Sequence, residues 1–120
     1  MKLLEWQWGY YANVHRDRRN LAIHLATNPL FIAGVLAVPA GLATQLWLTA
    51  VFGVIAMPLV VFIQGLGHRM EKEQPPALKG PLDVVSRIFA EQLITFPRYV
   101  LSGKLIEAWS TDSPRSSASA

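Results

Sequence analysis

Residues 20–68 read NLAIHLATNPLFIAGVLAVPAGLATQLWLTAVFGVIAMPLVVFIQGLGH and contain no aspartate, glutamate, lysine or arginine. The apolar run within them, residues 29–63, would form a helix of about 50 Å at about 1.5 Å per residue. One straight helix of that length exceeds the roughly 30 Å hydrocarbon core of a bilayer. The sequence therefore predicts an all-α protein built on a hairpin of two apolar helices.

The position of the reversal decides which residues face each other. Residues 39–41 and residues 44–45 are both suited to a turn, and the sequence alone does not choose between them. We take the reversal to fall near Leu46. A turn closer to residues 39–41 would bring His68 nearer to the level of His15.

With the reversal near Leu46, antiparallel pairing places polar residues opposite one another at the open end of the hairpin. His24 then lies opposite His68, and Asn28 lies opposite Gln64. The sequence thus predicts that two imidazoles meet at one face of a membrane.

The composition favours lipid as the solvent of this hairpin. The chain has 120 residues, enough for one domain, with 52% hydrophobic and 16% charged residues, whereas soluble domains carry roughly 25% charged residues. The net charge is +3, but the basic residues flank apolar runs instead of lining one polar face, so we expect anionic lipid and not nucleic acid as the acidic partner. The absence of cysteine excludes disulfides and thiolate metal sites.

Basic residues on both sides of the hairpin predict its orientation. Arg16, Arg18 and Arg19 precede it, Arg69 and Lys72 follow it, and the reversal carries no charge. By the positive-inside rule, both termini are expected in the cytoplasm, for a multi-pass protein of the bacterial inner membrane or the endoplasmic reticulum. The alternative is a hairpin buried inside a soluble protein.

The N-terminal residues 1–14 are rich in amphipathic aromatic rings: Trp6, Trp8, Tyr10 and Tyr11. Such rings favour the headgroup zone of a bilayer, so we expect a short interfacial helix. The alternative is that they cap a protein core.

A break between His15 and His24 is needed for both imidazoles to face one side. On one continuous helix they would point apart, since nine residues rotate by about 900° at about 100° per residue. Asp17 is a suitable N-cap for a new helix beginning at Arg18, and a turn at Arg16 to Asp17 removes the objection.

The C-terminal part is expected to form a proline-rich loop, a helix over residues 82–106 and a disordered tail over residues 110–120, so that residues 1–109 make one domain. Pro97 should kink the helix or divide it. One side of the helix is polar: Asp83, Arg87, Glu91, Thr95, Arg98 and Ser102. The other side is apolar: Leu82, Val85, Ile88, Phe89, Leu93, Phe96, Val100 and Leu101. We expect this amphipathic helix on the membrane surface or across the mouth of the hairpin.

The three histidines, His15, His24 and His68, all lie at boundaries between polar and apolar sequence. Glu71 follows His68 by three residues, so a continued helix would put its carboxylate on the same face as the imidazole. Imidazoles with a carboxylate suit iron or zinc. The alternative is that each histidine is an interfacial polar residue with a local hydrogen bond.

Three amides near the histidines are candidates for orienting the ring N–H groups of metal ligands: Asn20, Asn28 and Gln64. A Ser-His-Asp site is not indicated, because the serines lie mostly in the tail.

Two histidine motifs flank the apolar hairpin. They are YANVHRDRRNLAIH, with Tyr11, His15, Asn20 and His24, and QGLGH, with Gln64, Gly67 and His68, followed by Pro76-Ala77. In these features, over about residues 10–103, the chain resembles the family of membrane 2-hydroxy fatty acid dioxygenases. In the fungal pattern an acidic residue comes four positions after the GH histidine, whereas here that place is Lys72. The segment EQLITFPRYVLSG, residues 91–103, is similar to a short bacterial branch.

The resemblance implies an Fe(2+)-dependent enzyme that uses O2 to shorten a 2-hydroxy fatty acid by one carbon and release CO2, as in α-oxidation. It implies iron at His15, His24, His68 and Glu71, a fatty acyl substrate, and membrane lipid around the hairpin. Arg98 or Arg87 would steer the substrate carboxylate; the alternative is that both contact lipid phosphates.

A rival interpretation is a non-catalytic membrane module that binds metal or haem through His24 and His68, or an adaptor subunit. A homo-oligomer is compatible with the sequence, which does not determine the oligomeric state.

Overall fold

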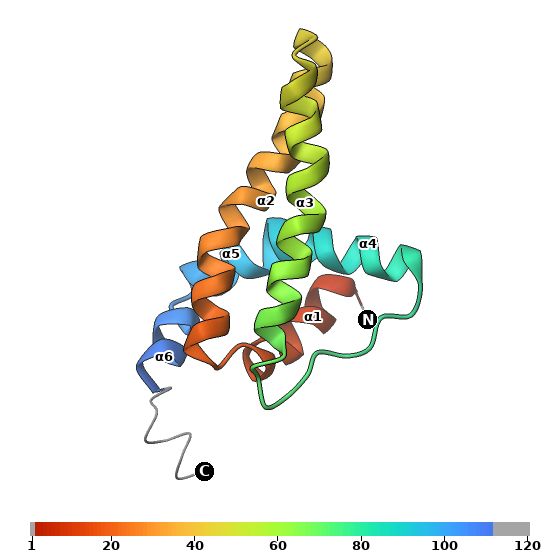
Figure 1. Ribbon diagram of the computed structural model, residues 1–120. Coiled ribbons are helices and arrows are strands. Elements are labelled where there is room, and N and C mark those ends of the chain that lie inside the picture. The colour runs from red at the N-terminus through yellow and green to blue at the C-terminus, as the bar shows by residue number, and fades with distance from the viewer. Residues whose placement is uncertain (1, 112–120) are drawn as a thin grey trace.

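The computed structural model describes residues 2–111, which are helical throughout apart from turns and one long loop and contain no strand (Figure 1). The all-α prediction is confirmed. In chain order the elements are α1 (Leu3–Tyr11), the 3₁₀ turn η1 (Ala12–Val14), α2 (Arg18–Thr44), α3 (Trp47–His68), α4 (Pro81–Ala90), the π-helical turn η2 (Glu91–Thr95), α5 (Phe96–Leu101) and α6 (Lys104–Thr111).

Helices α2 and α3 form the predicted hairpin, with the reversal at residues 45–46. Gln45 adopts a left-handed conformation, φ 59° and ψ 23°, and its N–H donates to the carbonyl of Leu42. Pro39 lies inside α2, so the alternative turn near it is excluded. Asp17 caps α2 as predicted, its side chain accepting a hydrogen bond of 2.8 Å from the backbone N–H of Arg19.

Small residues let the two hairpin helices approach closely. A Cβ atom added to Gly53 would collide with the carbonyl oxygen of Gly34, and one added to Gly41 would collide with the backbone nitrogen of Ala50. Such backbone contacts are typical of helix pairs in membranes, where lipid provides no hydrophobic drive for helix association. The glycines thus set the separation of α2 and α3.

Replacing Gly53 with leucine should therefore destabilise the hairpin by about 1–3 kcal/mol, the usual effect of overpacking. The collision partner is backbone, which cannot move aside as a side chain would. Thermal unfolding of the purified variant measures the loss. Gly65→Ala on the same helix is the control, since nothing lies within 4 Å of a Cβ there; equal melting temperatures for the two variants would contradict the close packing.

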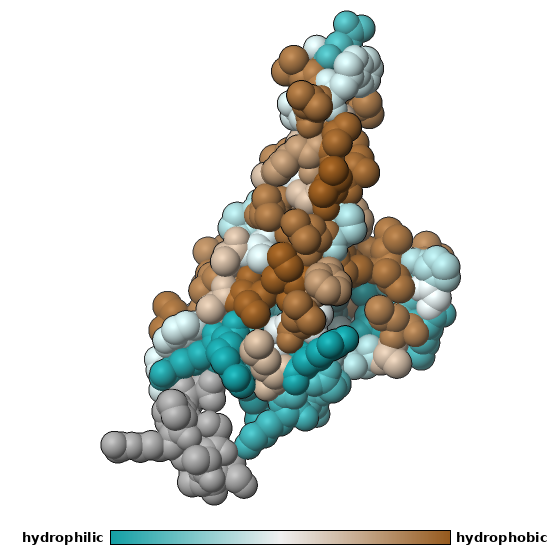
Figure 2. Space-filling view, viewed as in Figure 1, coloured by the Kyte–Doolittle hydropathy of each residue, from teal (hydrophilic) through white to brown (hydrophobic). Residues whose placement is uncertain are grey.

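The hairpin exposes its apolar side chains. Both helices are long and apolar enough to cross a membrane. Figure 2 shows hydrophobic residues over most of the hairpin surface, with hydrophilic residues gathered at the open end and a small group of them at the very tip. The large exposed hydrophobic residues of the hairpin are Leu25, Leu36, Leu42, Leu46, Trp47, Leu48, Val51, Phe52, Val54, Ile55, Leu59, Phe62 and Leu66. This surface matches a hydrocarbon environment better than water.

The shorter helices gather around the open end of the hairpin (Figure 1). A buried core there joins the N-terminal, hairpin and C-terminal segments through Tyr11, Leu21, Phe96, Tyr99 and Leu105. Trp8 packs against this core, so the aromatic rings of α1 do cap a protein core in part. Helix α1 was expected, and its place in the headgroup zone stays a prediction.

The expected helix over residues 82–106 is interrupted at more positions than the single break expected at Pro97. The wide turn η2 comes first, with the N–H of Phe96 donating to the carbonyl of Glu91, and it precedes Pro97, which has no N–H to continue the regular ladder. Gly103, at φ 83°, then separates α5 from α6. Residues 110 and 111 end α6, and the rest of the expected tail, residues 112–120, lies outside the described residues.

The polar side of α4 and η2 faces inward. Arg87 and Thr95 are buried, whereas Leu82 and Val85 on the apolar side are exposed. The segment therefore closes the mouth of the hairpin with its polar residues and presents its apolar residues outward.

Candidate metal centre

Four side chains from four separate segments converge at the open end of the hairpin. His15 lies between η1 and α2, His24 on α2, His68 at the end of α3, and Glu91 at the start of η2. Each offers one potential ligand atom, and these atoms all lie within 4.8 Å of one another. The structure thus brings together the three histidines that the sequence singled out and adds a carboxylate from the C-terminal segment.

Backbone carbonyls fix the orientation of two of the rings. Nδ1 of His15 lies 2.8 Å from the carbonyl oxygen of Tyr11, and Nδ1 of His24 lies 3.0 Å from that of Asn20. Because a carbonyl oxygen only accepts, Nδ1 carries the hydrogen in both rings. In the neutral tautomer the lone pair is then on Nε2, and the two Nε2 atoms are 3.4 Å apart. Two lone pairs turned toward one point suit a cation between them.

Glu91 provides the negative charge of the cluster. Its Oε2 atom lies 3.4 Å from Nε2 of His15 and 3.6 Å from Nε2 of His24. Burial raises the pKa of the Glu91 carboxyl, but the electrostatic interaction of the carboxylate with the two imidazoles outweighs burial and holds the pKa well below its ordinary value. The carboxyl is therefore ionised, as a metal ligand must be.

Two tyrosines hold His15 in place. The ring of Tyr11 stacks on the imidazole at a centroid distance of 3.8 Å, and its hydroxyl donates to Oε2 of Glu91 at 2.9 Å. The hydroxyl of Tyr99 donates to the carbonyl of His15 at 3.1 Å. Burial lowers the pKa of His15 and raises that of Tyr11 well above its ordinary value. His15 is thus neutral, and Tyr11 remains a donor that orients Glu91.

His68 supplies the observation that tests whether a cation fits. Its ring centroid lies 4.7 Å from that of His15 and 4.9 Å from that of His24. Its Nδ1 atom is buried and has no hydrogen-bond partner among residues 2–111. A buried polar atom without a partner is rare in folded proteins, and a metal ion would satisfy this one. The donor set of three imidazoles and one carboxylate suits a transition metal such as iron or zinc.

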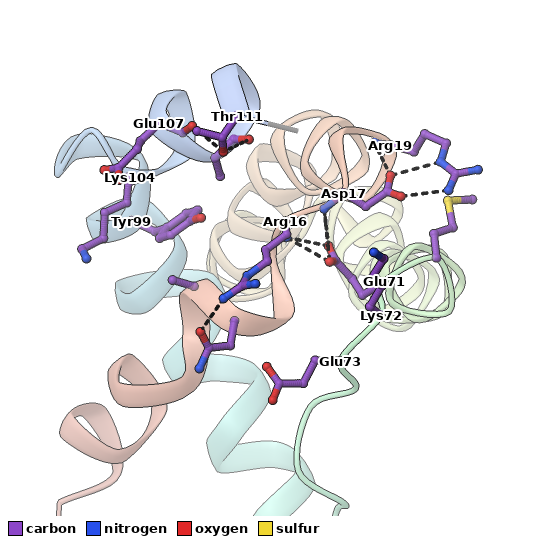
Figure 3. Close-up of a pocket in the computed structure, with 14 residues that line it drawn as sticks. Arg16, Asp17, Arg19, Glu71, Lys72, Glu73, Tyr99, Lys104, Glu107 and Thr111 are labelled. Atoms are coloured by element: carbon purple, nitrogen blue, oxygen red, sulfur yellow. Dashed lines mark hydrogen bonds and ion pairs between the residues drawn. The ribbon is translucent and has the colours of Figure 1, made fainter. Parts of the chain in front are cut away.

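Glu71, expected beside His68, lies elsewhere. Helix α3 ends at His68, so the helical spacing that would have put the two side chains on one face does not continue. The Glu71 carboxylate instead accepts hydrogen bonds from the backbone N–H groups of Arg16 and Asp17, at 2.9 to 3.1 Å (Figure 3). It also accepts one from the Asn20 amide at 2.7 Å. It fixes the turn that leads into α2, and Glu91 takes the place beside the histidines.

The three amides do not contact the imidazoles through hydrogen bonds in the described chain. The Asn20 side chain binds Glu71, while Asn28 and Gln64 both bind Gln92, with Asn28 Nδ2 at 2.8 Å from the Gln92 carbonyl. The backbone carbonyls of Tyr11 and Asn20 orient the rings instead. The prediction that the side chains of Asn20, Asn28 and Gln64 orient the ring N–H groups of the histidines is therefore wrong.

The two arginines expected to steer a carboxylate are engaged elsewhere. The Arg87 guanidinium donates to the carbonyls of Pro76 and Ala77 and to Asp83. Arg98 lies over the ring of Trp8, 4.0 Å from its centroid. Neither guanidinium forms a hydrogen bond or ion pair with the histidines.

The model of one protein family, the 2-hydroxy-palmitic acid dioxygenase Mpo1-like family, matches residues 1–95. The chain belongs to this family. The match covers the N-terminal helix, the hairpin and all four converging side chains of the Mpo1-like chain. No curated protein and no solved structure matches it.

A cavity of about 350 Å³ adjoins the cluster in this Mpo1-like protein. Its walls include His15, His68 and Glu91, together with parts of α1, α3, α4 and the loop after α3. A second cavity, of about 550 Å³, lies where Glu71 meets the start of α2 and contains none of the three histidines (Figure 3). Of these two cavities, the first gives a small molecule access to the converging side chains.

The sequence contained a usable signal for Glu91. It is an acidic residue on the polar side of an otherwise amphipathic segment, four positions after Arg87 and six before Pro97. The spacing shows which residues share a side, but not that this side faces inward. Gln92, which gathers Asn28 and Gln64, carried no signal, since glutamine is equally common on exposed helix surfaces.

Proposed function

We propose that this protein is an Fe(2+)-dependent dioxygenase that converts 2-hydroxy fatty acids to fatty acids one carbon shorter. The observation that carries the proposal is the convergence of His15, His24, His68 and Glu91 beside a cavity in a chain of the Mpo1-like family. Three imidazoles and one carboxylate can hold Fe(2+). When bound, iron would supply the activation of O2.

The reaction balances without a further reductant. A 2-hydroxy acid, RCH(OH)COOH, and O2 give RCOOH, CO2 and H2O. The bond between the carboxyl carbon and the hydroxyl-bearing carbon breaks, and the substrate provides all four electrons that reduce O2. A 2-oxo acid co-substrate is therefore not needed.

The residues of the chain prepare the site for this chemistry. Tyr11 and the two backbone carbonyls fix the rings of His15 and His24 and the carboxylate of Glu91 before any substrate arrives. His15 and His24 are 1% and 0% exposed, so water is excluded from that side of the cluster. Exclusion of water from that side of the cluster limits side reactions during oxygen chemistry.

The exposed apolar hairpin supports a location in the bacterial inner membrane or the membrane of the endoplasmic reticulum. We place both termini in the cytoplasm. In this orientation the cluster lies near the cytoplasmic face, where basic residues flank the hairpin. Because the chain has no cysteine, a single Gln45→Cys substitution at the tip can be labelled by a thiol reagent. Labelling from the cytoplasmic side would contradict the orientation.

The proposal is tested with the protein purified in detergent without added chelator. Bound metal is measured, and 2-hydroxypalmitate is supplied with O2. We expect iron close to one ion per chain, and pentadecanoic acid and CO2 as products. An iron-loaded protein that forms neither product would rule out this substrate, and a Soret band would indicate haem in place of a non-haem ion.

His24→Ala and His68→Ala should both lose the metal. Full iron content in both variants would show that the ion lies elsewhere in the protein.

A further inference from the structure

We propose that the cavity beside the cluster holds the fatty acid in one direction, with its carboxylate at Arg69 and its alkyl chain over Gly65. This inference rests on the proposed function for the identity of the ligand. Both residues line the cavity, Arg69 directly after His68 and Gly65 one helical turn before Arg69.

Arg69 is the cation available to a carboxylate in this cavity. Its side chain is exposed and forms no hydrogen bond or ion pair within residues 2–111. The other arginine of the cavity wall, Arg87, donates to two backbone carbonyls and to Asp83. An arginine fork binds a carboxylate through two parallel hydrogen bonds, and Arg69 has its fork free to do so.

The apolar end of the cavity points toward the tip of the hairpin. Val61 and Gly65 lie on the cavity wall, seven and three residues before His68 on the same helix. At about 1.5 Å per residue, Val61 is about 10 Å from His68 along the helix axis. Ile88 on α4 and Leu78 on the preceding loop are further apolar residues of the cavity wall.

This arrangement matches an amphiphile. The carboxylate and the hydroxyl-bearing carbon stay beside His68 and Glu91, while the alkyl chain follows α3 toward the hydrocarbon region. A cavity of about 350 Å³ is at the small end of the range for ligand sites. It therefore accommodates the head and the first part of the chain, and the rest extends along the apolar surface of the hairpin.

At Gly65 a larger side chain can narrow the cavity without disturbing the fold. An added Cβ would have no atom within 4 Å, and the residue is exposed. A leucine at this position therefore enters the cavity and not the packed hairpin. Its effect on binding can be separated from an effect on folding.

The experiment measures the affinity of 2-hydroxypalmitate for the full-length protein in zwitterionic nanodiscs, kept anaerobic to prevent turnover. Gly65→Leu is expected to weaken binding about 10-fold and to shift preference toward shorter chains. Arg69→Gln should weaken it about 10- to 100-fold, since a hydrogen bond to a charged group contributes about 1.5–3 kcal/mol, and Arg69→Lys should restore part of the affinity.

Two matched controls keep the interpretation specific. Leu66→Phe adds volume at the next position of α3, which does not line the cavity, and Lys72→Gln removes the same charge from an exposed residue outside it. Neither should change the affinity. Melting temperatures of all variants confirm that they are folded.

Binding and turnover separate the inference from the proposed function. If Gly65→Leu and Arg69→Gln weaken binding and no 2-hydroxy acid is oxidised, the binding direction stands and the catalytic proposal fails. If the wild-type protein oxidises 2-hydroxypalmitate and either variant keeps wild-type affinity and KM, the binding direction is wrong and the catalytic proposal stands. A wild-type protein that does not bind 2-hydroxypalmitate also overturns the inference.

Discussion

Replacing Glu91 with glutamine should lower the affinity for iron by at least about 100-fold, because even partners that only orient a ligand contribute about 10- to 100-fold. Glutamine keeps an oxygen that can accept the hydrogen bond from Tyr11 but removes the negative charge that faces His15 and His24. Equilibrium competition with a chelator measures the affinity, and the iron content after gel filtration gives an independent value.

The control for this substitution is Glu73→Gln, which removes one carboxylate from an exposed position. It should leave the iron affinity unchanged. If Glu91→Gln binds iron as tightly as the wild-type protein does, the carboxylate is not a ligand and the cluster consists of histidines alone.

Glu71→Ala should affect stability and not metal binding. We expect a large loss of stability and little change in the iron bound by the folded fraction. The Glu71 side chain is 6% exposed and accepts hydrogen bonds from two backbone N–H groups and one amide. Alanine would leave these donors without their acceptor. Since each unsatisfied buried group costs about 1–3 kcal/mol, we expect the free energy of unfolding to fall by about 3 kcal/mol or more.

Denaturant titration of the detergent-solubilised protein measures this loss, with iron per folded chain determined in parallel. Glu73→Ala, two residues further along the same loop, should change the stability by less than about 0.5 kcal/mol. A Glu71→Ala variant that unfolds like the wild-type protein but contains no iron would assign Glu71 to the metal and would contradict the hydrogen bonds seen here.

The hairpin could be derived from the sequence because its physical causes are local. A long stretch without charge needs a reversal, and counting outward from Leu46 pairs His24 with His68, whose rings do lie 4.9 Å apart. Asp17 could be identified as a cap for the same reason, since capping depends on residues only two or three positions away.

The fourth side chain of the cluster could not be derived in the same way. Glu71 is close to His68 in sequence, and the prediction assumed that α3 continued past His68. After α3 ends, the Glu71 carboxylate binds the backbone N–H groups of Arg16 and Asp17, far away in the sequence. The inward orientation of the polar side of α4 and η2 depends on contacts with α1, which is equally distant: Gln7 donates to the carbonyl of Arg87, and Tyr11 donates to Glu91. A helical pattern shows that residues share a side, but tertiary packing decides which side is buried.

The four converging side chains belong to four separate segments, so an ion bound by them would link these segments to one another at the open end of the hairpin. An ion at 100 times its Kd stabilises the folded state by about 2.7 kcal/mol, a large part of the stability of a small domain. Its loss would loosen the N-terminal helix, both ends of the hairpin and the C-terminal segment together. The lifetime of this protein in the cell would then depend on the supply of the ion, so that a shortage of the ion lowers the amount of folded protein.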